Sequence, residues 1–247
     1  MFDFQSDLIF PVHAVPEPGP LPPNAERLSL STSDGAKLAG VLIRAEQPNR
    51  EKSLILGFGG NAWNGQDVAE YLHELYPDHD VVAFHYRGYR PSTGSPSGAA
   101  LVADAPLVYD AAVKRLEPTR VIAVGFSIGT GIAAQLVRVR DIDGLILVTP
   151  FDSLKAVAQS MMPWLPIAPF FNHEIDAAGP LSETDVPVAI VAAENDELVR
   201  PERTDALRHE VRNLVFDRVI RRAGHNDIYT RSEFHDAMRE ALTRLKA

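Results

Sequence analysis

The sequence predicts an α/β fold with a mostly parallel central sheet of about eight strands, flanked by helices. Short apolar runs alternate with segments of helical period, and no linker divides them. Such alternation is typical of strand–helix–strand units, which form parallel sheets. Apolar residues make up 45% of the 247 residues, enough for a substantial core. We therefore expect a single domain over residues 27–247, preceded by an extended arm over residues 1–26.

The arm is rich in proline and shows no clear period. We expect it to lie across the body of the protein. Its apolar beginning is suited either to cover a groove or to contact a second copy of the chain, as a homo-oligomer. The apolar residues concerned are Phe2, Phe4, Leu8, Ile9 and Phe10.

The elements after the arm follow the alternation in order. Arg27–Thr32 and Lys37–Ile43 predict two strands joined by the turn signal Asp34-Gly35. Buried strands are then expected at Ser53–Leu56, Val81–Phe84, Val121–Val124, Leu145–Val148, Val188–Ala192 and Leu214–Val219, and helices at Gln66–Tyr76, Gly98–Leu116, Glu202–His209 and Ser232–Leu245, with a further helix from about Ile132.

The stretch Arg120–Ile132, RVIAVGFSIGTGI, is the most informative part of the chain. A strand buried on both faces runs into the motif G-x-S-x-G at residues 125–129, and a helical pattern follows. In this context the motif exposes a serine on a strained turn, and the flanking glycines leave room for it. Ser127 is therefore the candidate nucleophile. The alternative is a surface serine in a glycine-rich turn.

A serine nucleophile needs a base to take its proton and an acid to orient that base. Groups that must meet in an open α/β sheet lie beyond the carboxyl ends of its strands. Asp196 directly follows one late strand, and His225 follows the last one, in the chain order that this motif brings with it. Asp152, after the preceding strand, is the rival acid, and His85 ends a strand where it could line the cleft.

Stabilisation of a developing oxyanion needs two backbone N–H groups. Ile128, just after the serine and at a helix N-terminus, is expected to supply one. The loop Gly59-Gly60-Asn61-Ala62 is expected to supply the other, through Asn61. A phosphate-binding turn is the alternative for this loop, but the loop lacks both G-x-G-x-x-G and the lysine of a P-loop.

Composition narrows the classes of partner. A net charge of −9 argues against nucleic acid and anionic membranes. The absence of cysteine removes disulfides, thiolate catalysis and cysteine-ligated metals. The N-terminus lacks the positive region of a secretory signal, and no apolar run approaches the ~20 residues of a membrane span. We expect a cytoplasmic protein that requires no cofactor or metal.

The chain resembles the α/β-hydrolase superfamily, and in particular the small ABHD-type serine hydrolases and the related serine aminopeptidase-like branch. The resemblance covers roughly residues 30–240 and implies Ser127, Asp196 and His225 as the catalytic triad. It also implies a lid over about residues 155–182, an apolar, proline-broken segment that fits neither a strand nor one long helix. The matching motifs are Gly59-Gly60-Asn61 with Asn64, Tyr86-Arg87-Gly88-Tyr89 with Ser92, Gly94 and Pro96-Ser97, Gly125–Gly129, Pro150–Leu154, Asn195–Val199 and Gly224-His225-Asn226.

Two positions depart from the family pattern. Gly59 stands where relatives usually have histidine, although a backbone N–H does not need that side chain. Arg90 stands where they commonly have glycine and places a cation near the cleft, where it is expected to alter substrate choice. The cysteine cluster that anchors depalmitoylating relatives to membranes is missing from this chain.

The function expected from these residues is hydrolysis of a carboxylic ester or thioester of a small acyl substrate through an acyl-enzyme. Short to medium acyl chains should be preferred over charged substrates. The alternatives are a serine aminopeptidase-like peptidase and a non-catalytic binding module with the same fold. Four side chains of the lid are expected to line an acyl pocket, or else to be plain core: Met161, Trp164, Phe170 and Phe171.

Overall fold

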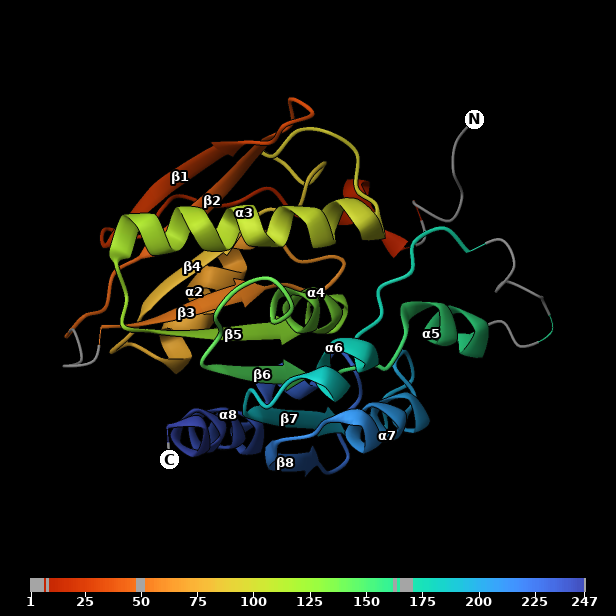
Figure 1. Ribbon diagram of the computed structural model, residues 1–247. Helices are drawn as coiled ribbons and strands as arrows, with labels where there is room; N and C mark the ends of the chain where they lie inside the picture. Colours follow the sequence, from red (N-terminus) through yellow and green to blue (C-terminus); the bar gives the residue numbers. More distant parts are fainter. Residues whose placement is uncertain (1–6, 8, 48–51, 162–163, 165–170, 247) are drawn as a thin grey trace.

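The computed structural model describes residues 7, 9–47, 52–161, 164 and 171–246. Within these residues one eight-stranded sheet has the order β1-β2-β4-β3-β5-β6-β7-β8 (Figure 1). This confirms the predicted α/β class. The strands are β1 (Ala25–Ser31), β2 (Lys37–Ile43), β3 (Ser53–Phe58), β4 (Asp80–Phe84), β5 (Arg120–Phe126), β6 (Gly144–Val148), β7 (Val188–Ala193) and β8 (Leu214–Ile220).

The sheet is mostly parallel, as expected from the continuous apolar runs. β1 pairs antiparallel with β2, and β2 pairs antiparallel with β4. All pairings from β4 to β8 are parallel. Every residue of β3, β6 and β7 is buried, because helices cover both faces of the sheet.

The helices divide between the two faces of the sheet (Figure 1). Side chains of α2 and α8 join the core on one face, and side chains of α3, α4, α6 and α7 join the core on the other. The helices are α2 (Gly65–Leu75), α3 (Gly98–Leu116), α4 (Ile128–Leu136), α5 (Leu154–Met161), α6 (Ala178–Glu183), α7 (Pro201–Glu210) and α8 (Ser232–Leu245), with the short 3-10 turns η1 (Val12–Ala14) and η3 (Ile228–Thr230).

Most element ends differ from the expected ones by one or two residues, and two of the differences concern the arm and the turn at Ser127. β1 begins at Ala25, inside the predicted arm, because its ladder with β2 continues to the pair Ala25–Ile43. β5 continues to Phe126, and α4 starts directly at Ile128, so only Ser127 separates strand from helix. A turn this short holds the serine at the carboxyl edge of the sheet.

Residues 155–182 contain most of α5 and part of α6, two short helices at opposite ends of the segment. α5 lies beyond the carboxyl ends of the strands, at the same end of the molecule as the beginning of the described arm (Figure 1). Among the described residues, none of the helices has both the length and the apolar character that a membrane crossing requires.

Candidate active site

Ser127 occupies a strained backbone position between β5 and α4. Its φ of 50° and ψ of −116° lie in a region that residues with a Cβ rarely adopt. The Ser127 N–H donates to the Val148 carbonyl of the neighbouring strand at 2.9 Å. A Cβ on Gly129 would lie 2.1 Å from the Phe58 carbonyl oxygen, so only glycine allows α4 to approach β3 this closely. Steric limits therefore explain why this fold requires glycine at position 129 of the motif.

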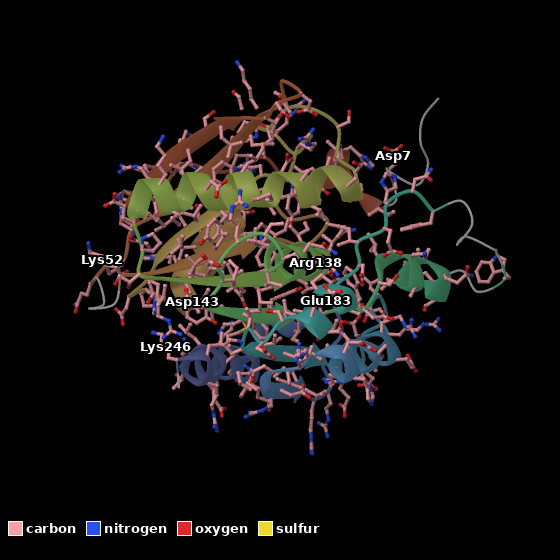
Figure 2. The ribbon with its side chains drawn as sticks, viewed as in Figure 1. Asp7, Lys52, Arg138, Asp143, Glu183 and Lys246 are labelled. Carbon is pink, nitrogen blue, oxygen red and sulfur yellow. The ribbon has the colours of Figure 1, made fainter. Side chains whose placement is uncertain are left out.

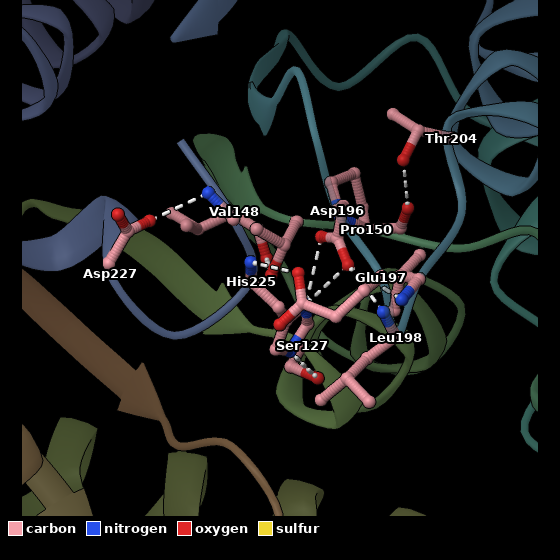
Figure 3. Close-up of polar contacts among 12 residues, drawn as sticks. Ser127, Val148, Pro150, Asp196, Glu197, Leu198, Thr204, His225 and Asp227 are labelled. Carbon is pink, nitrogen blue, oxygen red and sulfur yellow. Dashed lines mark hydrogen bonds and ion pairs between the residues drawn. The ribbon is translucent and has the colours of Figure 1, made fainter. Parts of the chain in front are cut away.

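The structure brings the three side chains proposed as a triad together (Figure 3). Ser127 Oγ lies 3.0 Å from His225 Nε2, and His225 Nδ1 lies 2.9 and 2.8 Å from the two carboxylate oxygens of Asp196. His225 and Asp196 are only 5% and 6% exposed. This is the geometry in which an imidazole accepts a hydroxyl proton while a carboxylate orients it.

Asp196 is held by the backbone of its own loop. Its Oδ1 accepts hydrogen bonds from the N–H groups of Leu198 at 3.0 Å and Val199 at 2.7 Å. The rival acid, Asp152, accepts instead from Arg203 at 3.2 Å. Burial raises the pKa of Asp152, and Arg203 opposes that shift. Of the two acids, only Asp196 contacts His225.

The loop that carries His225 is fixed by carboxylates that bind its backbone. Glu194 accepts from the Arg222 N–H at 2.7 Å, and Glu197 accepts from the His225 N–H at 3.2 Å. Asp227 accepts from the Gly224 N–H at 2.6 Å. The pKa of Asp227 is lowered, first by its hydrogen bond with Arg231 and then by that from Gly224. Glu194 and Glu197, which flank Asp196 in the sequence, thus bind the backbone of the His225 loop, whereas Asp196 binds the imidazole.

The loop expected to form the oxyanion hole lies next to Ser127. A Cβ on Gly60 would be 3.8 Å from the Ser127 Cβ. The Tyr86 hydroxyl donates to the Gly59 carbonyl at 2.8 Å, and the Tyr89 hydroxyl donates to the Asn61 carbonyl. Tyr86 and Tyr89 therefore hold the loop that is expected to supply the second N–H of the oxyanion hole, that of Asn61.

Asn61 and Ile128 both line a cavity of about 280 Å³ together with Ser127 and His225. Ile128 is the first residue of α4, so its N–H lies at the positive end of a helix. The roles of these two N–H groups in an oxyanion hole remain predictions, and the position of both residues in the cavity wall next to Ser127 agrees with those roles.

The rest of the cavity wall is apolar and comes largely from one face of α5. Leu154, Val157, Ala158 and Met161 line it, at the i, i+3, i+4 and i+7 spacing of a single helix face. That spacing was the signal in the sequence that could have found them. Among the described residues that line the cavity, only His225 has an ionisable side chain. The remaining lining residues are Ile9, Phe151, Leu198 and Val199.

Of the four pocket residues expected from the sequence, Met161 lines this cavity. Trp164 does not, and 79% of it is exposed, so the expectation for Trp164 is corrected. Phe171 packs instead against the core and the ring of His173, at a centroid distance of 6.3 Å. Phe170 lies outside the described residues. Proximity along the chain to an apolar segment was not enough to predict which side chains turn toward Ser127.

Arg90 and His85 also stand apart from the cavity wall. Arg90 pairs with Glu17 of the arm at 2.8 Å, with 80% of its side chain exposed, so it is not a cation inside the cleft. His85 is buried, and its Nδ1 accepts from the Gly65 N–H at 3.2 Å. Burial lowers the pKa of His85 to about 4, with a smaller contribution from Arg27. No group of three histidine or acidic side chains suited to a metal ion occurs in the part of the chain that the structure describes.

Comparison with known proteins agrees with the observed fold. The model of the alpha/beta hydrolase fold family matches residues 54–180. An uncharacterized protein of Mycobacterium tuberculosis is 28% identical over 243 residues, covering 92% of this chain and 85% of that protein. The lysophosphatidylserine lipase ABHD12 of Danio rerio is 32% identical over 167 residues, which are 59% of this chain but only 44% of the lipase.

Among solved structures, the esterase Pf2001 of Pyrococcus furiosus superimposes with a TM-score of 0.71 and covers 94% of this chain and 97% of its own. At 19% sequence identity this likeness shows the fold. Fold and site together define a hydrolase. The chain belongs to the α/β-hydrolase family, and its relatives put it among the ABHD-type members.

Proposed function

We propose that this protein is a serine hydrolase that cleaves carboxylic esters or thioesters through an acyl-enzyme intermediate. The observation that carries the proposal is the hydrogen-bonded row of Ser127, His225 and Asp196, of which Ser127 and His225 line a largely apolar cavity. A hydroxyl next to a buried imidazole–carboxylate pair is the arrangement that activates a serine at neutral pH.

In the first half of the reaction, Ser127 Oγ attacks the carbonyl carbon of the acyl group. With the proton of the neutral imidazole on Nδ1, facing Asp196, Nε2 is free to accept the serine proton. The N–H groups of Asn61 and Ile128 stabilise the oxyanion of the tetrahedral intermediate. His225 then passes the proton to the departing alcohol or thiol.

In the second half, His225 takes a proton from water, and the resulting hydroxide attacks the acyl-serine. The carboxylic acid leaves, and the proton returns to Ser127. Asp196 stays ionised throughout and stabilises the transient imidazolium. These steps use only groups of the chain, the substrate and water.

The apolar wall supports a neutral acyl group as the preferred substrate. An ionised group in this cavity would lose its hydration without gaining a partner of opposite charge from the wall, which is costly. The volume of about 280 Å³ is near the lower end of small-molecule pockets, roughly 300 to 1,000 Å³. It favours short and medium acyl chains. The lipase activity named for ABHD12 belongs to the same broad chemistry of acyl esters.

A peptidase of the aminopeptidase type is less well supported. Such an enzyme needs an acid placed to bind a free amino terminus, and none of the described residues that line the cavity is acidic. Glu194 binds the backbone of Arg222, and Glu174 pairs with Ser153 and Lys155. Comparison of alanine p-nitroanilide with p-nitrophenyl butyrate would reveal a peptidase by faster cleavage of the anilide.

The experiment that tests the proposal uses p-nitrophenyl butyrate and the variant Ser127→Ala. We expect a burst of p-nitrophenol from the native protein and a loss of kcat/KM of at least about 10⁴-fold in the variant, because the nucleophile is gone. A fluorophosphonate probe should label the native protein only. A Ser127→Ala protein with full activity would overturn the mechanism, and failure of the native protein to react with the probe would favour a binding module.

A further inference from the structure

The arm contributes a side chain to the cavity that contains Ser127. Ile9 lines that cavity together with the α5 side chains, although the chain places it more than a hundred residues before the nucleophile. Asp7, two residues earlier, lies at the same end of the molecule as α5, whereas Lys52, Asp143 and Lys246 lie at the opposite edge of the sheet (Figure 2). The arm therefore reaches the carboxyl edge, where the candidate active site is located.

Phe10 anchors this part of the arm in the hydrophobic core. It is 1% exposed, and its ring packs edge-on against His173 at a centroid distance of 5.4 Å. His173 lies within residues 155–182, the segment expected to form the lid, and its backbone packs against the start of α3 at Gly98. A buried aromatic anchor restricts the movement of its neighbour in the chain, so Ile9 is held against the cavity.

Two buried amide side chains hold the following part of the arm. Asn64 Nδ2 donates to the Pro16 carbonyl at 3.3 Å, and Gln66 Nε2 donates to the Gly19 and Pro20 carbonyls at 3.1 and 3.2 Å. Asn64 and Gln66 are 0% and 1% exposed. The same Asn64 caps α2 by accepting from the Asp67 N–H at 2.9 Å. The arm is thus bound on both sides of η1.

We propose that the arm is a wall of the acyl site and that Ile9 limits the length of acyl chain that the site accepts. The inference rests on the proposed acyl hydrolysis and specifies its substrate class, neutral saturated chains of medium length. Each methylene group that enters the cavity gains about fourfold in binding constant from its burial. A larger side chain at position 9 removes room for such groups, and a smaller one adds room.

The test compares Ile9→Trp and Ile9→Ala with matched changes at Val12, which is 36% exposed on the same arm and does not line the cavity. The measurement is kcat/KM for p-nitrophenyl acetate, octanoate and decanoate. We expect Ile9→Trp to lower the octanoate-to-acetate ratio at least about tenfold, the loss of two methylene positions. Ile9→Ala should raise the decanoate-to-acetate ratio severalfold, and Val12→Trp and Val12→Ala should leave both ratios within twofold.

A binding measurement separates this inference from the proposed function. Octanamide, a neutral eight-carbon probe, is titrated by calorimetry into Ser127→Ala protein with and without Ile9→Trp. If esters are not cleaved but Ile9→Trp weakens octanamide binding tenfold, the proposed chemistry fails and the wall inference stands. If octanamide does not bind, or binds equally well to both proteins, the inference is overturned. Equal losses for acetate and octanoate would also overturn it, since the arm would then act without regard to chain length.

Discussion

The two sides of the candidate active site are built in different ways. On one side, Ser127, Asp196 and His225 follow the ends of β5, β7 and β8, and their loops are held by hydrogen bonds to backbone N–H groups. On the other side, the apolar wall comes largely from α5 and from Ile9 of the arm. Met161 at the end of α5 is 43% exposed, in contrast to the nearly buried histidine and aspartate.

This difference suits the strand side to the chemical steps and the arm side to the selection of substrate. A buried parallel sheet positions groups at its carboxyl edge with little freedom, as the proposed proton transfers require. A wall made of a short helix and a terminal segment is easier to vary without disturbing that edge. We therefore expect changes on the strand side to act on kcat or on stability, and changes on the arm side to act on substrate choice.

The largest effect on activity is expected from substitutions of the acids on the strand side. Asp196→Asn keeps the shape but no longer holds the imidazole in the required tautomer, and we expect kcat to fall by about 10⁴-fold. Asp152→Asn is the matched control, because Asp152 also follows a strand but pairs with Arg203. We expect a loss of less than tenfold there, measured with p-nitrophenyl butyrate. If Asp152→Asn lost more activity than Asp196→Asn, Asp152 rather than Asp196 would be the acid that orients the imidazole.

The second prediction concerns the pH dependence of stability at the end of β4. Burial lowers the pKa of folded His85 to about 4 from a value of 6.5, so below pH 6.5 the unfolded chain binds a proton that the folded chain does not. The free energy of unfolding should therefore fall by about 3 kcal/mol from this group as the pH drops from 6.5 to 4.

Urea denaturation across this pH range measures the effect. His85→Gln should flatten the profile relative to the native protein, and His13→Gln, at an exposed position of the arm, should leave it unchanged. Identical profiles for all three proteins would show that His85 is not kept neutral by the fold.

A third, smaller effect is expected from the loop that carries Asn61. Tyr89→Phe removes the hydroxyl that binds the Asn61 carbonyl, and one such hydrogen bond is worth about 1 kcal/mol. We expect kcat to fall by about fivefold with little change in KM, because the oxyanion forms only during the reaction. Tyr109→Phe is the control, since its hydroxyl binds the Asp141 carbonyl far from the cavity. If kcat were the same in Tyr89→Phe and Tyr109→Phe, the Tyr89 hydroxyl would not position this loop.

The smallest effect is expected on the arm side, at the ion pair of Arg90 with Glu17. Both side chains are more than 70% exposed, so solvent screens their attraction. Arg90→Ala should change activity and the octanoate-to-acetate ratio by less than twofold. Gln66→Ala, which removes a buried amide bound to the arm backbone, should change that ratio more. If Arg90→Ala changed the ratio more than Gln66→Ala, the ion pair with Glu17 would be the main interaction that holds the arm.

Much of the strand side could be predicted from the sequence. Apolar β-branched runs, the turn at Gly125–Gly129 and the positions of Asp196 and His225 after strands are local patterns, and each follows from short-range geometry. The sequence favoured Asp196 and kept Asp152 as a rival, because both follow strands, and the structure separates the two acids by their distances to His225. The wall was predicted poorly, since Trp164 and Phe171 are close to α5 in sequence but face elsewhere.

The α/β class, the order of the elements and the three side chains proposed to carry the chemistry follow from local patterns in the chain, because periodicity and turn chemistry depend on neighbouring residues. Three arrangements became visible only in the folded protein: Ile9 lines the same cavity as the face of α5, Arg90 pairs with Glu17, and Tyr86 and Tyr89 hold the loop before α2. These contacts join segments far apart along the chain, and the packing that selects them is a property of the whole core rather than of any local pattern.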